Sequence, residues 1–160
     1  MSQTLKITTP SDREVVMTRR FDASPSLLFD AMTRPELLRQ WLEAPGRTLA
    51  VCESDLKAGG RYRYVWRGPG KSDVGMHGVF REVSRPDRFV RTEAWEDWDA
   101  GESLVTTVLT EQEGKTLLTI TQLFPSRAVR DEVVKAGLQH TADASFAKLA
   151  DLLASAAAND

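Results

Sequence analysis

RYRYVWR, residues 61–67, is the most informative stretch of this sequence. Side chains along a β-strand point alternately to opposite faces, so this run separates into an aromatic face and an arginine-rich face. The first face carries Tyr62, Tyr64 and Trp66, and the second carries Arg61, Arg63, Val65 and Arg67. We expect the arginines to meet water and the aromatics to point inward, where they form either ordinary core or the wall of a cavity.

Strand-like runs and turn signals continue on both sides of this segment, from about residue 49 to residue 124. The runs are TLAVCES (48–54), MHGVFREVS (76–84), RFVRTEAWE (88–96), ESLVTTVLTE (102–111) and TLLTITQLF (116–124). Glycine, proline and aspartate cluster between them, as in GPGKSDVG (68–75) and DWDAG (97–101). Short strands at even spacing predict a meander in an antiparallel sheet.

Two short helices are expected after a first strand at EVVMTRRF, residues 14–21. Ser24 is a suitable N-cap, and Pro25 suits the first helical position because proline lacks the N–H that is unpaired there. A second short helix begins at Pro35 and ends at Trp41. The polar residues 1–12 read as a loose lead-in.

One long helix is expected to close the chain, capped by Ser126 and running to about Ala154. It would span roughly 40 Å, long enough to cover the dry face of the sheet. Its expected inward stripe is Val134, Leu138, Ala142, Ser145, Leu149 and Leu152. Small residues fill its middle, from Gly137 to Ser145, which indicates either close packing on the sheet or a space between helix and aromatic strand faces.

The composition is that of one folded domain of 160 residues, with 41% hydrophobic and 28% charged residues. Because the net charge is −2 and the arginines are scattered among acids, we expect neither nucleic acid nor a membrane as a partner. The single cysteine, Cys52, excludes an intrachain disulfide and suits a cytoplasmic location. It is either a reactive thiol or, as is usual in a strand, a small buried hydrophobe.

The sequence contains no recognisable motif for metal binding, phosphate binding or nucleophilic catalysis. His77 and His140 lie far apart and in no metal-binding spacing, and no phosphate-binding loop or G-x-S-x-G turn occurs. We therefore expect no metal and no cofactor. His140 is either a proton donor near the inward face of the last helix or a half-exposed helix histidine.

Glu93 is the polar residue that most invites a functional interpretation. It shares a strand face with Phe89, Arg91 and Trp95, and a carboxyl group among aromatics has a raised pKa unless a cation pairs with it. It would orient a ligand or act as a general acid or base. An exposed edge strand would show the same alternation, so both interpretations stay open.

Four segments together resemble a known family: RRFDASPSLLFDAMTRPELLRQW (19–41), CESDLKAGGRYRYVWRG (52–68), HGVFREVSRPDRFVRTEAW (77–95) and FAKLADLL (146–153). They are similar to the family with homology to the activator of the Hsp90 ATPase, within the START-like, polyketide-cyclase-like superfamily. The resemblance implies an α+β helix-grip fold: a curved seven-stranded antiparallel sheet around a long C-terminal helix, with two short helices between the first two strands. It places a single domain at residues 13–154, with flexible ends at 1–12 and 155–160.

Three functions fit this resemblance. The first is binding of a small hydrophobic, aromatic or lipid-like ligand in an internal cavity, without catalysis. The second is a cofactor-free cyclase or hydrolase that works through Glu93 or His140, and the third is a co-chaperone with a protein partner. The protein would be a monomer or a homodimer. The residues expected to bind the ligand are Trp41, Tyr62, Tyr64, Trp66, Phe80, Glu93, Trp95, Leu138 and Thr141.

Overall fold

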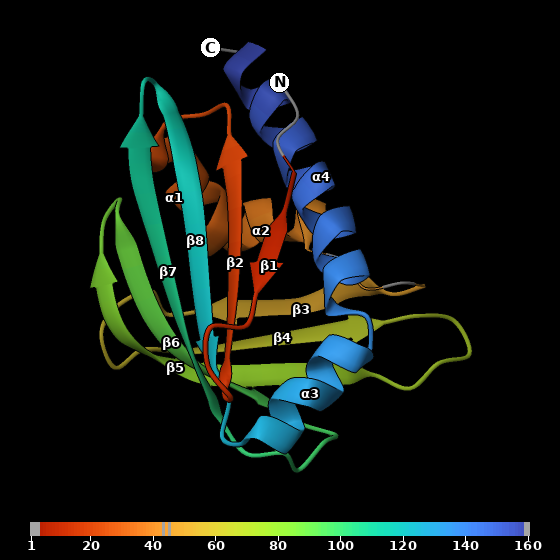
Figure 1. Ribbon diagram of the computed structural model, residues 1–160. Coiled ribbons are helices and arrows are strands. Elements are labelled where there is room, and N and C mark those ends of the chain that lie inside the picture. Colours follow the sequence, from red (N-terminus) through yellow and green to blue (C-terminus); the bar gives the residue numbers. More distant parts are fainter. Residues whose placement is uncertain (1–3, 43, 45, 159–160) are drawn as a thin grey trace.

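A strongly curved antiparallel sheet wraps around a long C-terminal helix in the computed structural model, which describes residues 4–42, 44 and 46–158 (Figure 1). The strands are β1 (Lys6–Thr8), β2 (Glu14–Phe21), β3 (Thr48–Ser54), β4 (Arg61–Arg67), β5 (Val74–Ser84), β6 (Arg88–Trp95), β7 (Ser103–Gln112) and β8 (Lys115–Leu123). Their order across the sheet is β1-β2-β8-β7-β6-β5-β4-β3. The predicted meander and the helix-grip arrangement are therefore confirmed.

The sheet has eight strands where seven were expected. The additional strand β1 lies in the segment 1–12 that was expected to be a loose lead-in, and it pairs with β2 from Lys6 opposite Thr18 to Thr8 opposite Val16. Leu5, just before it, is buried in the core. This short strand covers the edge of β2, whose backbone groups would otherwise be unpaired.

Two irregularities bend the sheet. The register shifts between Leu49 and Val51 in the β3–β4 pair and between Phe80 and Glu82 in the β5–β6 pair. Bulges of this kind increase the local twist and bend the strand. As a result β3, β4 and β5 lie across the direction of β2, β7 and β8, and the sheet forms a deep concave face (Figure 1).

Two short helices, α1 (Pro25–Thr33) and α2 (Pro35–Trp41), lie at one end of this concave face. The predicted cap of α1 is confirmed, because the N–H of Leu27 donates to Oγ of Ser24 at 3.2 Å. Trp41 ends α2 and is 3% exposed. Its indole N–H donates to the carbonyl oxygen of Ala31 at 2.8 Å and thereby ties α2 to α1.

The expected single C-terminal helix is wrong, because the structure has two helices, α3 (Arg127–Lys135) and α4 (Leu138–Ala158). Ser126 caps α3 as predicted, accepting from the N–H of Val129 at 3.2 Å. The chain breaks at Gly137, whose φ of +100° lies in the left-handed region that suits glycine at the end of a helix. Val134, expected on the inward stripe, is 41% exposed on α3. Residues 155–158, expected to be a flexible end, continue α4, and residues 159–160 lie outside the described residues.

Replacing Gly137 by alanine is expected to lower the free energy of unfolding by about 1–2 kcal/mol, since an L side chain is strained at positive φ. Urea unfolding checks this. Gly137→Asn is the matched control, because asparagine tolerates the left-handed region and should lose less stability. An alanine variant as stable as the wild type would show that the break needs no glycine.

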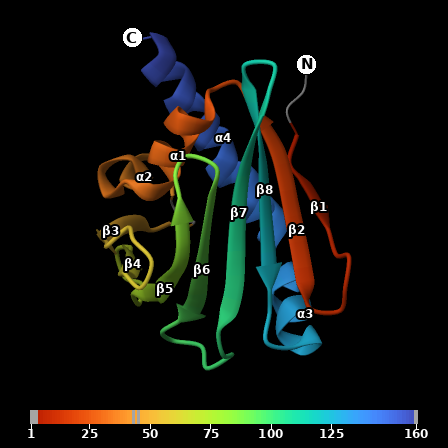
Figure 2. The same cartoon turned by 90° about the vertical axis from the view of Figure 1, so that its left-hand side faces the viewer.

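All four helices lie on the concave side of the sheet, as the turned view shows (Figure 2). Helix α4 packs through Phe146, Leu149 and Leu153, all of them buried. The Phe146 ring meets Phe21 of β2 edge-on and stacks on Trp41 of α2, each with ring centroids 6.1 Å apart. None of the described helices is long and apolar enough to span a membrane.

Candidate ligand-binding cavity

A cavity of about 200 Å³ lies between α4, the concave face of the sheet and the two short helices. Its apolar wall consists of Met17, Met32, Leu38, Trp41, Leu42, Phe89, Val105, Ile120, Leu138, Ala142 and Phe146. Its polar groups come from Tyr64, Arg91, Glu93, Thr107, Gln122, Thr141 and Ser145. A largely apolar wall with a few polar groups is the usual character of a small-molecule site.

The aromatic strand face points inward as predicted. Tyr62 and Tyr64 are each 2% exposed and Trp66 is 5% exposed, whereas Arg61, Arg63 and Arg67 are exposed. Arg63 is held outside the sheet by Glu96, with 2.8 Å from its Nε to the carboxylate. The alternation in RYRYVWR therefore separates the buried aromatics from the exposed arginines, while Val65 on the arginine face is also buried.

Five of the nine residues expected to bind a ligand line this cavity: Trp41, Tyr64, Glu93, Leu138 and Thr141. The structure places the other four, Tyr62, Trp66, Phe80 and Trp95, off the cavity. Tyr62 packs on Phe80 with ring centroids 5.4 Å apart, and its hydroxyl donates to the carbonyl oxygen of Thr92. Trp66 packs on Trp95 at 6.0 Å and donates to the carbonyl oxygen of Leu42 at 3.1 Å. These four support the cavity wall from behind or beside it.

The polar groups at one end of the cavity form a connected cluster. The side-chain amide of Gln122 donates to the Glu93 carboxylate at 2.6 Å and to the Ser103 hydroxyl at 2.9 Å. Arg91 lies beside Glu93 on the same face of β6 and has its guanidinium carbon 4.7 Å from the centre of the Tyr62 ring. These side chains come from three adjacent strands, β6, β7 and β8, whose register brings them together.

Burial sets the charge state of this cluster. It raises the pKa of the Glu93 carboxyl above its usual range, although Arg91 and the hydrogen bond from Gln122 act in the opposite direction. Burial also disfavours the charge on Arg91, but a guanidinium is not deprotonated in proteins. Arg91 therefore stays positively charged, while Glu93 is easier to protonate than an exposed carboxyl.

The sequence argument missed Arg91 and Gln122 as site residues. Arg91 was visible as a neighbour of Glu93, where it was expected only as a pairing cation. Gln122 had a weaker signal, a polar residue on a strand face whose neighbouring positions, Leu118, Ile120 and Phe124, are apolar. In the structure Gln122, rather than Arg91, holds the carboxylate of Glu93.

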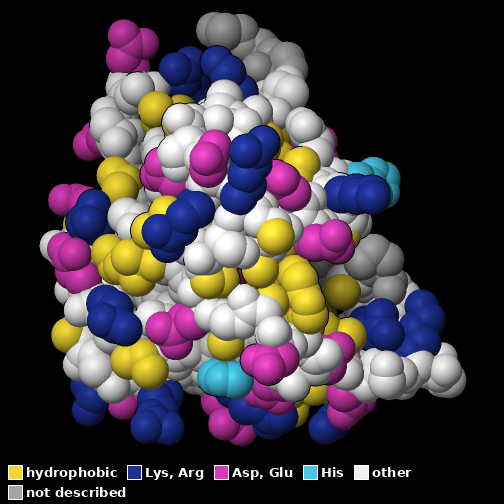
Figure 3. Space-filling view, turned by 60° about the horizontal axis from the view of Figure 1, so that its bottom comes forward, with side chains coloured by type: hydrophobic (Ala, Val, Ile, Leu, Met, Phe, Trp, Pro, Cys, Tyr) yellow, Lys and Arg dark blue, Asp and Glu magenta, His cyan; other side chains and the backbone are white. Residues whose placement is uncertain are grey.

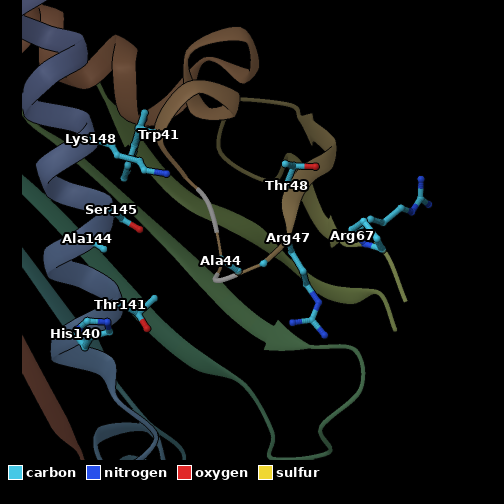
Figure 4. A pocket seen from close by; sticks show the side chains of 12 residues that line it. Trp41, Ala44, Arg47, Thr48, Arg67, His140, Thr141, Ala144, Ser145 and Lys148 are labelled. Atoms are coloured by element: carbon cyan, nitrogen blue, oxygen red, sulfur yellow. The ribbon is translucent and has the colours of Figure 1, made fainter. Parts of the chain in front are cut away.

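A groove of about 430 Å³ lies beside the cavity (Figure 4). Trp41, Thr141 and Ser145 border both the groove and the cavity. Lys148 and His140 line the groove from α4, and Arg47 lines it from the segment before β3. His140 is exposed and lies outside the cavity itself, which agrees with a surface histidine on the helix.

The remaining candidates carry little chemistry. Cys52 is buried, and burial raises the pKa of its thiol, so it behaves as a small hydrophobe. Within the part of the chain that the structure describes, no group of three or more histidine, cysteine or acidic side chains could hold a metal ion. Acidic and basic side chains alternate over the face shown in Figure 3, with hydrophobic side chains between them.

Comparison with known proteins confirms the resemblance noted in the sequence. The family described as "Activator of Hsp90 ATPase homolog 1-like protein" matches residues 22–154. No curated protein matches the chain.

Solved structures share the fold along most of the chain. A Rhodobacter sphaeroides protein is 30% identical, with a TM-score of 0.91, over 95% of this chain and 99% of its own. CalU16 from Micromonospora echinospora is 20% identical, with a TM-score of 0.63, over 95% of this chain and 85% of its own. An HSP90 activator from Plasmodium falciparum is 25% identical, with a TM-score of 0.56, over 70% of this chain and 73% of its own.

Proposed function

Since the chain belongs to the Activator of Hsp90 ATPase homolog 1-like family, whose members share this sheet-and-helix frame, we propose that it binds a small aromatic molecule between the sheet and α4. The observation that carries the proposal is the cavity itself. It has an apolar wall and a polar cluster, and it shares lining residues with a neighbouring groove. The apolar wall would hold the ring, and the polar cluster would fix its orientation.

The size of the cavity favours a ligand with one aromatic ring. An apolar cavity of about 150 Å³ accepts benzene, and this cavity measures about 200 Å³. Trp41, Phe89 and Phe146 supply aromatic surfaces for edge or stacked contacts with a ring. A ring with one short polar substituent fills this space.

The residues that line the cavity fit a binding protein better than an enzyme. The described residues of the cavity wall include one acid, Glu93, and no histidine, and the Glu93 carboxylate accepts a hydrogen bond from Gln122. An acid–base pair at opposite sides of a reacting group is therefore not assembled among them. The likeness to an HSP90 activator favours a co-chaperone as the second candidate, but that likeness covers only 70% of this chain.

Calorimetric titration with two single-ring probes, phenylacetate and phenylacetamide, tests the proposal. We expect saturable binding of at least one probe with one molecule per chain. Ala142→Phe should abolish it, because Ala142 lines the cavity and the larger ring would occupy the space. Ala147→Phe is the matched control on the exposed side of α4 and should bind as the wild type does. Failure of both probes, or full binding by Ala142→Phe, would contradict the proposal.

A further inference from the structure

Arg91 has more hydrogen-bond donors than the protein satisfies. A guanidinium carries five N–H donors, and among the described residues the Arg91 side chain makes one hydrogen bond, a long one of 3.5 Å to the Tyr64 hydroxyl. Its Nε is buried, and none of the described groups accepts a hydrogen bond from it. Among the described residues no carboxylate forms an ion pair with Arg91 within 4.0 Å. The residue as a whole is half-buried, but a donor that water does not reach is costly unless something else completes its bonding.

Aromatic rings hold the Arg91 side chain without using its donors. The guanidinium carbon lies 4.7 Å from the centre of the Tyr62 ring and 5.8 Å from that of Tyr64. Contacts of this kind stabilise the charge and restrict the plane of the group. They leave the N–H donors at the edges of the guanidinium available. Two of these donors can form parallel hydrogen bonds to the two oxygens of a carboxylate.

Glu93 does not supply that carboxylate. Its Oε2 accepts from Gln122 at 2.6 Å, on the side of β8, and burial makes its charged form less favourable. The other titratable groups near Arg91 are the hydroxyls of Tyr62 and Tyr64 on β4. Helix α4 contributes only uncharged residues to the cavity wall, including Leu138, Thr141 and Ala142. The positive charge of Arg91 is thus not cancelled by an ion pair.

The groove beside the cavity carries charge of the same sign. Arg47 and Lys148 line it from opposite sides, His140 lines it from α4, and no acid occurs among its described lining residues (Figure 4). Arg67 also borders the groove but forms an ion pair with Asp73 at 3.0 Å. A cleft lined by one sign of charge raises the local concentration of oppositely charged ligands.

We propose that the ligand is a small aromatic acid that enters along this basic groove and binds with its carboxylate on Arg91 and its ring against the apolar wall. The inference rests on the proposed function and specifies the ligand class. The cavity of about 200 Å³ has room for one ring with a short acidic arm, and a long fatty acid would not fit inside.

The test compares phenylacetate with phenylacetamide, which have the same shape but differ in charge. At neutral pH the wild type should bind the anion about 10- to 100-fold more tightly, the range for hydrogen bonds to a charged group. Arg91→Gln should abolish this preference, because the loss of affinity falls on the anion. Arg61→Gln, the same substitution at an exposed arginine of β4, is the control and should keep the full preference.

The outcomes separate the two proposals. Equal affinity of the wild type for both probes, or an Arg91→Gln variant that still prefers the anion, overturns the inference and leaves the binding function standing. Binding of neither probe to the wild type overturns both. If Arg91→Gln does not fold, the two probes are compared on the wild type and on Arg91→Lys instead. Lysine keeps the positive charge but loses the planar group that forms two parallel hydrogen bonds, so a weaker preference for the anion in this variant would support the inference and an unchanged preference would overturn it.

Discussion

Replacing Phe146 by alanine is expected to lower the free energy of unfolding by about 3–5 kcal/mol, the usual cost of removing a buried phenylalanine. Phe146 is 6% exposed and joins three elements, because its ring contacts Phe21 of β2 and Trp41 of α2 from its place on α4. The surrounding elements are tied to one another and cannot collapse fully into the space. Loss of this ring should therefore loosen the helix from the sheet.

Urea unfolding followed by circular dichroism measures this loss. Asp151→Ala, at an exposed position on the same helix, is the control and should stay within about 0.5 kcal/mol of the wild type. Phe146→Leu should fall between the wild type and the alanine variant. A loss below about 1.5 kcal/mol for Phe146→Ala would contradict the role given to this ring.

The wild type is expected to become less stable as the pH rises, and replacing Glu93 by glutamine is expected to remove this decrease. Burial raises the pKa of Glu93 in the folded protein, so between the ordinary carboxyl pKa and this raised value the folded state binds more protons than the unfolded state. Stability should fall as pH rises through that window, by about 1.4 kcal/mol for each unit by which the pKa is raised. The glutamine variant has no charge to bury and keeps an oxygen that can accept from Gln122.

Unfolding free energies from about pH 4.5 to about pH 8 measure this effect as the difference between variant and wild type. The difference should grow toward higher pH, where the variant is the more stable protein. Glu111→Gln, at an exposed position, should show no such growth. A Glu93→Gln variant that is less stable than the wild type at high pH would mean that the ionised carboxylate is well paired in the fold.

The sequence predicted the parts of the fold that depend on local patterns. Alternation in RYRYVWR separated the buried aromatic side chains from the exposed arginines, and Ser24 and Ser126 marked two helix starts. The break at Gly137 was missed because the surrounding residues all suit a helix, and only the backbone at φ +100° shows that the glycine ends one. Strand β1 was missed because a run of three residues is too short to show a strand pattern and forms a strand here by pairing with the edge of β2.

The candidate site was harder to predict, because facing inward and lining a cavity are different properties. Tyr62 and Tyr64 lie on the same strand face, yet only Tyr64 reaches the cavity, while Tyr62 packs behind it on Phe80. That difference arises from the curvature of the sheet, which no local pattern encodes. The pairing of Glu93 with Gln122 likewise depends on strands far apart in the sequence.

Methyl NMR of the methionines, during titration with phenylacetate and then with phenylacetamide, tests the central claim of a ligand in this cavity most directly. Met17 and Met32 line the cavity, whereas Met76 on β5 lies opposite Tyr64 and does not line it. The account predicts saturable shifts of the Met17 and Met32 methyl signals that are larger than any shift at Met76. Signals of Met17 and Met32 that stay unmoved with both probes at saturating concentration would contradict it.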